Sequence, residues 1–310
     1  MYKGRRIAAV VPAYNEELLI GKTLADMPDL IDVIVAVDDC STDTTLACMQ
    51  ESRDPRLQIV ALPENQGVGG AVIAGHRAAI QAGAEIMVVL AGDNQMDPIY
   101  LPDLLEPIVT DGYGFTKGNR FYSRESLNGM PRLRVMGNMA LTFLNKAASG
   151  YWHIADPQNG YTAVTAESLA QVPLDRVSKR YDFENDLLVW LSIAGVRAKD
   201  VRIPSRYGAE TSTLAVPSTA LRLSVCFFRG FWRRMWLKYM LWSFSPIALL
   251  FGAGLFLTGA GMAVGLWASA AAFTGTSPTA GTTVLAVLPF LCGFVLLTQA
   301  LVLDIQESPD

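Results

Sequence analysis

The stretch "EIMVVLAGDNQMDP" (residues 85–98) joins an apolar run to a cluster of polar side chains. The continuous apolar run predicts a strand of the kind found in parallel sheets that are covered on both faces. Asp93 follows this strand directly, and the pair Asp97 and Pro98 is typical of the start of a helix. The stretch therefore predicts a buried strand whose carboxyl end presents carboxylate and amide oxygens.

The first half of the chain repeats this pattern of apolar strands that alternate with helices. We predict strands at residues 7–11, 32–39, 57–62 and 85–93, and helices at 16–27, after 45 and at 69–81. Such alternation predicts an α/β fold with a mostly parallel sheet. Ligands of these sheets bind beyond the carboxyl ends of the strands, where the chain has "AYNEE" (13–17), "VDDCSTD" (37–43) and "AGDNQMDP" (91–98). We therefore expect these three polar clusters to form one site.

The next hundred residues have a more mixed pattern. They predict strands at residues 115–121, at the end of 150–164 and at 196–204, and helices at 133–149 and 183–195. We find no internal repeat and no low-complexity linker, so the sheet is expected to continue through this part of the chain.

Charge and cysteine content exclude several classes of protein. The formal net charge of −4 gives no indication of nucleic-acid binding. The four cysteines show neither a CxxC pair nor zinc-ligand spacing, so we interpret them as reduced thiols. The apolar run near residue 10 is short and ends at Pro12, which favours a first strand over a signal peptide.

The C-terminal part is predicted to lie on and across a membrane. No charged residue occurs from Tyr239 to Leu303, and this stretch holds two candidate spans, at about 246–271 and 282–303, each long enough to cross ~30 Å of hydrocarbon. The aromatic and basic segment 218–242 before them predicts interfacial helices. The positive-inside tendency then places the catalytic domain in the cytoplasm. The alternative is that both spans are core helices of a soluble protein.

Two spans joined by a short turn form a hairpin, which returns the C-terminus to the side of the membrane from which the first span started. Glycines in the first span allow close approach of another helix, so we expect that hairpins associate into a homo-oligomer. These glycines are Gly252, Gly254, Gly259, Gly261 and Gly265.

The second polar cluster contains two adjacent carboxylates, Asp38 and Asp39, at a predicted strand end. Ser41 and Thr42 are suited to cap the helix that follows, and Asp43 in its first turn is favoured by the helix dipole. Capping leaves the adjacent carboxylates unexplained. Asp39 would suit a hydrogen bond to a uracil or guanine edge or to a ribose.

Two other segments have structural interpretations beside functional ones. Asn15 and Glu16 would cap the first helix, or else form a wall for a nucleotide base or ribose. The segment "GVGG" (67–70) suggests a dinucleotide-binding loop, but the third glycine of that motif would fall at Val72. We therefore interpret it as a tight entry into a helix that packs on the sheet.

The oxygen ligands of the third cluster suit a hard cation, Mg²⁺ or Mn²⁺. Such an ion would neutralise a diphosphate leaving group. Gly92 permits a close approach of the backbone. Asp97 has the alternative role of starting the next helix, so Asp93 is the preferred ligand.

Taken together, these motifs resemble the family 2 glycosyltransferases with a GT-A fold, and more narrowly the group of dolichol-phosphate-mannose synthases and bactoprenol glucosyltransferases. The resemblance extends from about residue 10 to residue 212, and the two-helix tail is also similar. The matching motifs are "VVPAYNEE", "VDDCSTD", "NQGVGGA", "AGDNQMDP", "KGNRF", "DPQNGYTA", "FENDLL" and "RYGAETS".

The resemblance implies a UDP- or GDP-sugar donor, a divalent metal ion and a polyprenyl-phosphate acceptor. The positions that it assigns to the nucleotide sugar are Pro12, Tyr14, Glu16, Asp39 and Asp93. Asp93 and Gln95 match metal-binding positions. Relatives commonly carry Asp-x-Asp here, and Ala91 replaces the first acid, so that position cannot bind the metal.

The resemblance also implies an acceptor side and a catalytic set. The expected contacts of the acceptor phosphate are Lys117 and Arg120 near the mouth of the site, with Arg206 and Ser212, and the expected catalytic residues are Asp156, Arg120 and Arg206. A phosphate nucleophile is largely ionised at neutral pH, with a second pKa of about 6. Asp156 is therefore either a base or an orienting group.

Several other charged or titratable residues have simpler interpretations. Glu184 and Asp186 are alternatives for the base, although both are expected to be exposed at a helix start, where capping is the simpler role. His76 and His153 are isolated, and we assign no chemistry to either. Lys117 and Arg120 could also be solvated surface charges.

These observations predict a membrane-anchored, metal-dependent inverting glycosyltransferase that moves a hexose of mannose or glucose type to dolichyl or undecaprenyl phosphate. We expect a GT-A domain at 1–212, amphipathic juxtamembrane helices at 213–243 and a transmembrane hairpin at 244–304. A processive polysaccharide synthase is disfavoured because the Gln-x-x-Arg-Trp motif is absent. The alternatives are a non-catalytic membrane partner, with Ala91 as a trace of decay, or transfer to another lipid or saccharide.

Overall fold

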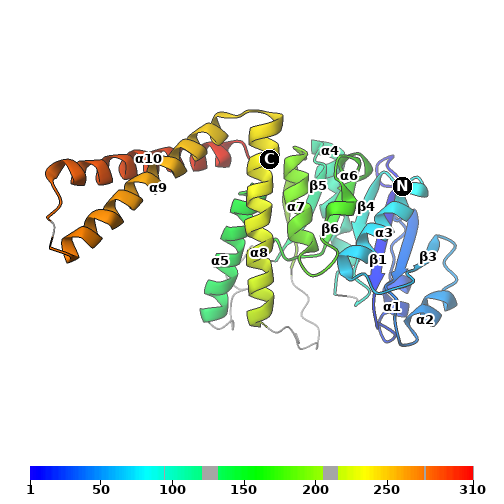
Figure 1. The fold of residues 1–310 in the computed structure, drawn as a ribbon. Coiled ribbons are helices and arrows are strands. Elements are labelled where there is room, and N and C mark those ends of the chain that lie inside the picture. The colour runs from blue at the N-terminus through cyan, green and yellow to red at the C-terminus, as the bar shows by residue number, and fades with distance from the viewer. Residues whose placement is uncertain (94, 121–131, 205–215, 276, 310) are drawn as a thin grey trace. The chain divides into compact units, whose positions relative to one another are not determined.

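The computed structural model describes the whole chain except residues 94, 121–131, 205–215, 276 and 310. The described residues form two compact units (Figure 1). The first comprises Met1–Trp232 together with Pro309, and the second comprises Arg233–Ser308. The boundary between them falls inside the segment predicted as juxtamembrane helices.

The first unit is built on a mixed sheet with seven strands among the described residues. The strands are β1 (Ile7–Ala13), β2 (Val33–Asp38), β3 (Leu57–Ala61), β4 (Ile86–Val89), β5 (Phe115–Asn119), β6 (Thr162–Thr165) and β7 (Ala198–Arg202). Their order in the sheet is β3-β2-β1-β4-β6-β5-β7. Neighbouring strands are parallel except where β6 pairs with β4 and with β5. The predicted α/β fold with a mostly parallel sheet is confirmed.

Helices cover both faces of this sheet. The helices of the first unit are α1 (Ile20–Ala25), α2 (Thr45–Glu51), α3 (Val68–Gln81), α4 (Leu101–Asp111), α5 (Arg132–Ser149), α6 (Ala166–Ala170), α7 (Phe183–Ile193) and α8 (Val216–Arg234). Ile7, Ala9 and Val11 of β1 belong to one core cluster with side chains of α1, α2 and α4. Val10 points to the opposite face, where it meets α3. The alternation along β1 thus builds two apolar layers, and each buried valine or isoleucine contributes roughly 2 kcal/mol.

Glycines bring α3 unusually close to the sheet. A Cβ placed on Gly75 would lie 2.3 Å from Cγ1 of Val10 and 3.1 Å from Cγ2 of Val37. Gly67 precedes α3 with φ of +83°, a conformation that favours glycine. The conformation of Gly67 supports the interpretation of "GVGG" as a tight helix entry. The contact with the sheet is made further along the helix, at Gly75, whereas a Cβ on Gly69 would lie 2.6 Å from that of Phe183 on α7.

Three helices on one side of the first unit, α5, α7 and α8, stand next to one another (Figure 1). A Cβ on Gly230 of α8 would lie 2.9 Å from Val189 of α7 and 3.8 Å from Ala148 of α5. Helix α7 is therefore covered by two others, which explains why ten of its eleven residues are buried.

Two predictions about helix caps are wrong. Helix α1 begins at Ile20 with Leu19 as its N-cap, so Asn15 and Glu16 do not cap it. Helix α2 has Thr44 as its N-cap, so Ser41 and Thr42 do not cap that helix either. The reason is that these polar residues bond across the loops after β1 and β2 instead of along their own helices.

The second unit contains a π-helical segment (Met235–Trp242) and two long apolar helices, α9 (Pro246–Phe273) and α10 (Ala280–Gln306). Both helices are long and apolar enough to cross a membrane, and 17% and 11% of the residues in their most apolar stretches are buried. They are thus not core helices of the kind that the alternative required. At their ends, the buried Arg234 holds Asp304 through a 3.0 Å bond from Nη2 to Oδ2, so both ends of the hairpin lie together.

Glycines of α9 pack mainly inside the hairpin. A Cβ on Gly261 would lie 2.6 Å from the carbonyl oxygen of Ala286, and a Cβ on Gly254 would lie 3.0 Å from that of Gly293. Gly252 and Gly259 have open space around them within the described structure. Gly254 and Gly261 therefore allow the close approach of α10 within the same hairpin, and the expected association between hairpins stays a prediction.

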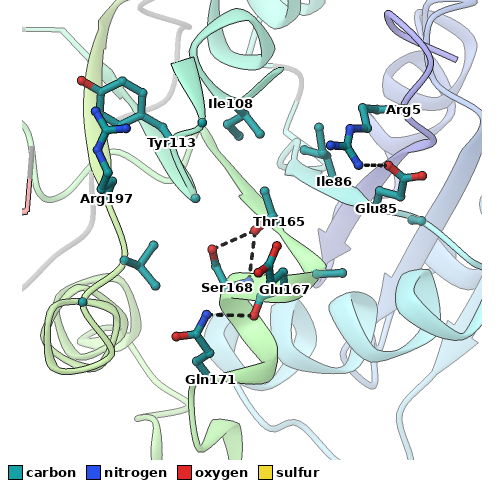
Figure 2. A pocket seen from close by; sticks show the side chains of 16 residues that line it. Arg5, Glu85, Ile86, Ile108, Tyr113, Thr165, Glu167, Ser168, Gln171 and Arg197 are labelled. Atoms are coloured by element: carbon teal, nitrogen blue, oxygen red, sulfur yellow. Dashed lines mark hydrogen bonds and ion pairs between the residues drawn. The ribbon is translucent and has the colours of Figure 1, made fainter. Parts of the chain in front are cut away.

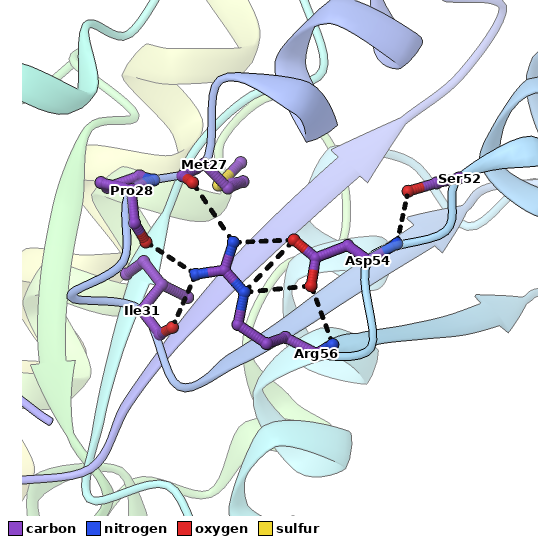
Figure 3. Close-up of polar contacts among 6 residues, drawn as sticks. All are labelled: Met27, Pro28, Ile31, Ser52, Asp54 and Arg56. Atoms are coloured by element: carbon purple, nitrogen blue, oxygen red, sulfur yellow. Dashed lines mark hydrogen bonds and ion pairs between the residues drawn. The ribbon is translucent and has the colours of Figure 1, made fainter.

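An arginine fixes the connection between α1 and β2 (Figure 3). The Arg56 guanidinium donates to the carbonyl oxygens of Pro28 at 2.8 Å and Ile31 at 3.0 Å, and it forms an ion pair of 2.7 Å with Asp54. A planar guanidinium with five donors suits several carbonyl acceptors at once. This contact ties the loop before β2 to the start of β3.

His76 on α3 is a buried titratable side chain that was not predicted to be so. It is 2% exposed, and its Nδ1 has no hydrogen-bond partner among the described residues. Burial lowers the pKa of His76 from 6.5 to about 4, because the charged ring would lose its hydration. The unfolded chain therefore binds a proton at a higher pH than the folded chain does.

The first prediction concerns acid stability. The contribution of neutral His76 to stability is fully present above pH 6.5 and is lost as the pH falls toward about 4. Urea unfolding at pH 7 and pH 5 should show a loss of about 2 kcal/mol that the His76→Gln variant lacks. An identical slope in wild type and His76→Gln would contradict this account.

Candidate active site

The loop after β2 is anchored by Asp39, which is 3% exposed. Its Oδ1 accepts from the backbone N–H of Gln66 at 2.7 Å, and its Oδ2 accepts from the N–H of Gly67 at 2.8 Å. The carboxylate therefore holds the "NQG" loop that follows β3. Sequence reasoning assigned Asp39 to the nucleotide, and that role stays a prediction beside this structural one.

The loops after β1 and β2 are bonded to each other. Asn15, with φ of +57°, accepts the N–H of Thr42 at its Oδ1 at 2.9 Å. The N–H of Glu16 donates to Oγ1 of Thr45 at 2.7 Å. Pro12 is buried near the carboxyl end of β1, and Tyr14 is exposed just after that strand. The predicted nucleotide residues Pro12, Tyr14, Glu16 and Asp39 thus lie at the adjacent ends of β1 and β2.

The third polar cluster is held against the end of β1. The N–H of Gly92 donates to the carbonyl of Pro12 at 3.1 Å, and a Cβ on Gly92 would lie 3.0 Å from that of Ala13. The expected close approach of the backbone at Gly92 is therefore confirmed. Asp93 is half-buried in this loop, and its Oδ1 accepts from the N–H of Gln95 at 3.0 Å.

Asp97 has the helix-starting role that was predicted as its alternative. Its side chain accepts from the N–H of Ile99 at 3.1 Å, and Pro98 occupies the first position of a short 3₁₀ helix (Pro98–Tyr100). This capping role accounts for Asp97, and the assignment of a metal to Asp93 and the exposed Gln95 stays a prediction.

The donor set fits a cation that is shared with a ligand. The described residues contain no group of three His, Cys, Asp or Glu side chains that could hold an ion alone. Asp93 and Gln95 offer one carboxylate and one amide oxygen, and Mg²⁺ typically takes one or two carboxylates together with substrate phosphates and water. The residues present are thus compatible with a metal that arrives with a diphosphate.

On the other side of β4, Arg120 and Asp156 form a bidentate ion pair. Arg120 Nε lies 2.7 Å from Oδ2 of Asp156, and Arg120 Nη2 lies 3.1 Å from Oδ1. The backbone N–H of Arg120 also donates to Oδ2 at 3.2 Å. The Asp156 side chain is completely buried, whereas that of Arg120 is 38% exposed. One buried carboxylate thus fixes the orientation of a guanidinium that reaches solvent.

The sequence suggested that Lys117 lies near the mouth of the site, but the structure places it elsewhere. It is fully buried in β5, and its Nζ donates to the carbonyl oxygen of Asn159. Burial lowers its pKa, and the carboxylates of Glu184, Asp156 and Asp200 oppose that shift. The interpretation as solvated charge is wrong for Lys117, because β6 and β7 flank β5 on both sides. Its predicted contact with an acceptor phosphate stays untested.

Two acidic residues of this region were missed or misplaced. Glu184 and Asp186 were expected to be exposed at the start of α7, but Glu184 is half-buried and Asp186 is 4% exposed. Asp186 accepts the N–H of Ser178 at 2.9 Å, so it is bound to the preceding loop. Burial raises the pKa of Glu184 above its usual range. The amphipathic pattern gave no signal of this, because α7 is covered by α5 and α8 as well as by α3.

Asp200 on β7 had no assigned role. Its Oδ2 accepts from the N–H of Ala155 at 2.7 Å and from Nδ2 of Asn119 at 2.9 Å. Burial raises its pKa to about 6, against the opposing effects of the Ala155 N–H and of Lys117. The single acidic residue of the strand "AKDVR" was the available signal.

The two halves of the site meet at Gly160. A Cβ on Gly160 would lie 3.2 Å from Cε of Met96 and 3.8 Å from Oε1 of Glu184. The hydroxyl of Tyr161 donates to the carbonyl of Asp97 at 2.9 Å. The loop that carries Asp93 therefore adjoins the segment that carries Asp156. The remaining predicted residues, Arg206 and Ser212, lie outside the described residues.

A separate pocket of about 440 Å³ lies at the opposite edge of the sheet (Figure 2). It is lined by residues at the amino ends of β4, β5 and β7, and its polar groups are largely bonded to one another. Arg5 pairs with Glu85 at 2.8 Å, and the Thr165 hydroxyl bonds to Ser168 at 2.8 Å. Since ligands of such sheets bind at the carboxyl ends, we place the candidate site at the edge of Asp93 and Arg120.

A scan against models of protein families gives a match over residues 8–172, to "Glycosyl transferase family 2". The chain belongs to this family. The matched region contains β1 to β6 and hence the Asp93 loop, Arg120 and Asp156. The GT-A type of fold expected from the resemblance is confirmed by this match together with the mostly parallel sheet.

Several named relatives of this family 2 chain are, by their names, transferases that act on dolichyl or undecaprenyl phosphate. One is the UDP-N-acetylglucosamine–dolichyl-phosphate N-acetylglucosaminyltransferase of Methanococcus voltae, which is 29% identical over 59% of this chain and 78% of its own length. Another is the undecaprenyl-phosphate mannosyltransferase of Micrococcus luteus, which is 30% identical over 64% of this chain and 82% of its own length. The narrower resemblance seen in the sequence is thereby confirmed.

Among solved structures, the fold is similar to that of glucosyl-3-phosphoglycerate synthase from Mycobacterium tuberculosis. A complex of that enzyme with Mn²⁺, UDP-glucose and phosphoglyceric acid matches with a TM-score of 0.57 and 21% identity, over 74% of this chain and 80% of that one. A complex with Mg²⁺ and UDP matches with a TM-score of 0.54. At this level of identity the similarity concerns the fold.

The second prediction concerns the anchor at Asp39. In Asp39→Ala, the N–H groups of Gln66 and Gly67 lose their acceptors, which should lower the free energy of unfolding by roughly 2–4 kcal/mol. Hydrogen exchange should become faster in peptides that cover residues 65–70. Asp43→Ala, which removes a half-buried carboxylate that accepts from the N–H groups of Thr45 and Glu17, should not affect exchange in those peptides. Unchanged exchange in Asp39→Ala would show that the carboxylate does not hold this loop.

Proposed function

We propose that this protein transfers a hexose from a UDP- or GDP-sugar to a polyprenyl phosphate at a membrane surface. The observation that carries the proposal is the pairing, at one sheet edge of a family 2 domain, of an oxygen-rich loop with an oriented arginine. The loop contains Asp93 and Gln95, and the arginine is Arg120, held by Asp156. The names of the relatives support a polyprenyl phosphate as the acceptor.

The donor would bind at the ends of β1, β2 and β4. We assign Asp93 and Gln95 to a Mg²⁺ or Mn²⁺ ion, with the donor diphosphate and water as its other ligands, because Ala91 supplies no carboxylate. When bound, this ion would neutralise the charge of the departing nucleotide. The metal and nucleotide complexes of the structurally similar glucosyl-3-phosphoglycerate synthase support this assignment.

The acceptor phosphate would meet Arg120. Arginine recognises phosphate well because its guanidinium offers several N–H donors in one plane. Asp156 binds two of its nitrogens from the buried side, and the Arg120 side chain is 38% exposed. We therefore assign Asp156 as an orienting group and not as a base, since the phosphate nucleophile is already ionised at neutral pH.

The reaction follows from this arrangement. An oxygen of the polyprenyl phosphate attacks the anomeric carbon of the donor sugar as the bond to the nucleotide diphosphate breaks. A direct displacement of this kind inverts the configuration at that carbon. Arg120 holds the nucleophile and lowers the repulsion between the two phosphate groups. The buried Lys117 would hold the Asn159 carbonyl instead of contacting the substrate.

The C-terminal helices suit an acceptor that is a lipid. Two long, largely exposed apolar helices follow the catalytic unit. Helix α8 exposes Phe228 and Trp232 beside Arg229, which is typical of a helix at the membrane interface. We propose that the hairpin spans the membrane and that the catalytic unit lies on its cytoplasmic side, as the positive-inside tendency favours.

The third prediction tests this function. Full-length protein in detergent, with Mg²⁺ or Mn²⁺, should convert one nucleotide sugar and undecaprenyl or dolichyl phosphate into a glycolipid and free UDP or GDP. Asp93→Asn should lower the transfer rate roughly 100-fold, as expected when a group that stabilises the leaving charge is lost. Asp97→Asn, which alters the cap of the neighbouring 3₁₀ helix, is the matched control and should retain activity within about threefold.

Three results would count against the proposal. Full activity of Asp93→Asn would exclude the assigned metal site. Nucleotide binding without release of UDP or GDP from any donor, in the presence of lipid acceptors, would favour the alternative of a non-catalytic membrane partner. Transfer to water or to a saccharide, but not to a polyprenyl phosphate, would exclude the assigned acceptor.

A further inference from the structure

One oxygen atom links the two chain segments that carry Arg120 and Asp156. Oδ2 of Asp200 accepts from the side chain of Asn119 at 2.9 Å and from the backbone N–H of Ala155 at 2.7 Å. Asn119 directly precedes Arg120, and Ala155 directly precedes Asp156. The carboxylate therefore bonds to the neighbour of each member of the ion pair.

The position of Asp200 follows from the register of the sheet. Strands β5 and β7 are parallel, and Lys117 of β5 lies opposite Asp200 of β7. Asn119 lies two residues further along β5, on the same face as Lys117. Asp200 thus lies beside the carboxyl end of β5, where the chain leaves the sheet toward Arg120.

A second link ties the same two segments together. The Lys117 ammonium donates to the carbonyl of Asn159, and Nδ2 of Asn159 donates to the carbonyl of Gly118 at 2.8 Å. The segment 155–159 is therefore attached to β5 directly at Asn159 and through Asp200 of β7 at Ala155. Asp200 supplies the attachment nearest to the ion pair.

The environment of Asp200 indicates more than ordinary strand packing. Its Oδ1 is buried and has no hydrogen-bond partner in the described part of the chain. Burying a carboxylate with one unsatisfied oxygen is costly, and a threonine or valine would suit a strand at this place better. The contacts of Oδ2 give the reason that an acid stands here.

We propose that Asp200 is a positioning residue of the acceptor subsite, which holds Arg120 and Asp156 in register so that the guanidinium receives the acceptor phosphate. This proposal rests on the function proposed above, because it assigns Arg120 to that phosphate. It concerns the acceptor side: Asp39, Asp93 and Gln95 are held by other contacts and do not bond to Asp200 in any described interaction.

The test compares three variants of the full-length protein in detergent. Asp200→Ala removes the oxygen that accepts both hydrogen bonds. This variant should raise the KM for polyprenyl phosphate at least about tenfold, with the KM for the nucleotide sugar unchanged within about twofold. Asp200→Asn keeps an oxygen that accepts from Asn119 and Ala155, so it should restore the acceptor KM to within about threefold of wild type. Lys199→Ala, on the opposite face of β7 and paired with the exposed Asp111, is the control and should match wild type.

A second readout does not depend on activity. Hydrogen exchange at the Ala155 amide should be at least about tenfold faster in Asp200→Ala than in wild type, and near wild type in Asp200→Asn. If Asp200→Ala fails to fold, Asn119→Ala carries the test, since it removes one of the two bonds and should raise the acceptor KM by a smaller factor.

The outcomes separate this inference from the proposed function. Unchanged exchange at Ala155 in Asp200→Ala would overturn the inference whether or not the wild type transfers sugar. Equal changes in the KM values of both substrates would also overturn it, because a general loss of structure would affect both sides. If the wild type transfers no sugar but exchange is faster in Asp200→Ala, the proposed function would be overturned. The role of Asp200 in holding the Ala155 segment would still be confirmed.

Discussion

The carboxyl ends of β1, β2, β4, β5 and β7 meet at one edge of the sheet because β6 is the described strand that runs in the opposite direction. The parallel pairing of β1 with β2 and β4, and the reversal of β6, have one consequence each. The polar loops after β1, β2 and β4 lie next to one another, which creates the donor side. The loop that enters β6 also arrives at that edge, which brings Asp156 to Arg120 at the end of β5. The site depends on these strand directions.

The proposed acceptor side is built from charges that are removed from water. Lys117 and Asp156 are completely buried, and Asp200 and Glu184 have raised pKa values because of burial. Each such group costs several kcal/mol unless it is paired and hydrogen-bonded. The network satisfies most of them through backbone groups of 155–159 and through Arg120. Such a network favours one arrangement of the loop, at some expense of stability, which suits a site that must orient a phosphate nucleophile.

Much of the donor side could be predicted from the sequence, because continuous apolar runs identify buried parallel strands and polar clusters mark their ends. Asp93, Gln95 and Asp97 lie where those rules place them. The acceptor side could be predicted less well. Lys117 belongs to "FTKGN", in which all five residues are buried between β6 and β7, so alternation gave no warning. For Asn15 the sequence suggested a helix cap or a wall for the nucleotide. Its bond to Thr42 could not be predicted, because the two residues are 27 positions apart in the chain.

The account's central claim is that donor and acceptor share the edge of Asp93 and Arg120. A structure of the full-length protein with Mn²⁺ and UDP or GDP tests it most directly. We predict metal density in contact with a carboxylate oxygen of Asp93, the nucleotide beside Asp39, and its diphosphate on the side of the metal that faces Arg120. A nucleotide bound at the opposite edge, in the pocket beside Arg5 and Glu85, or a metal ion away from Asp93, would contradict the account.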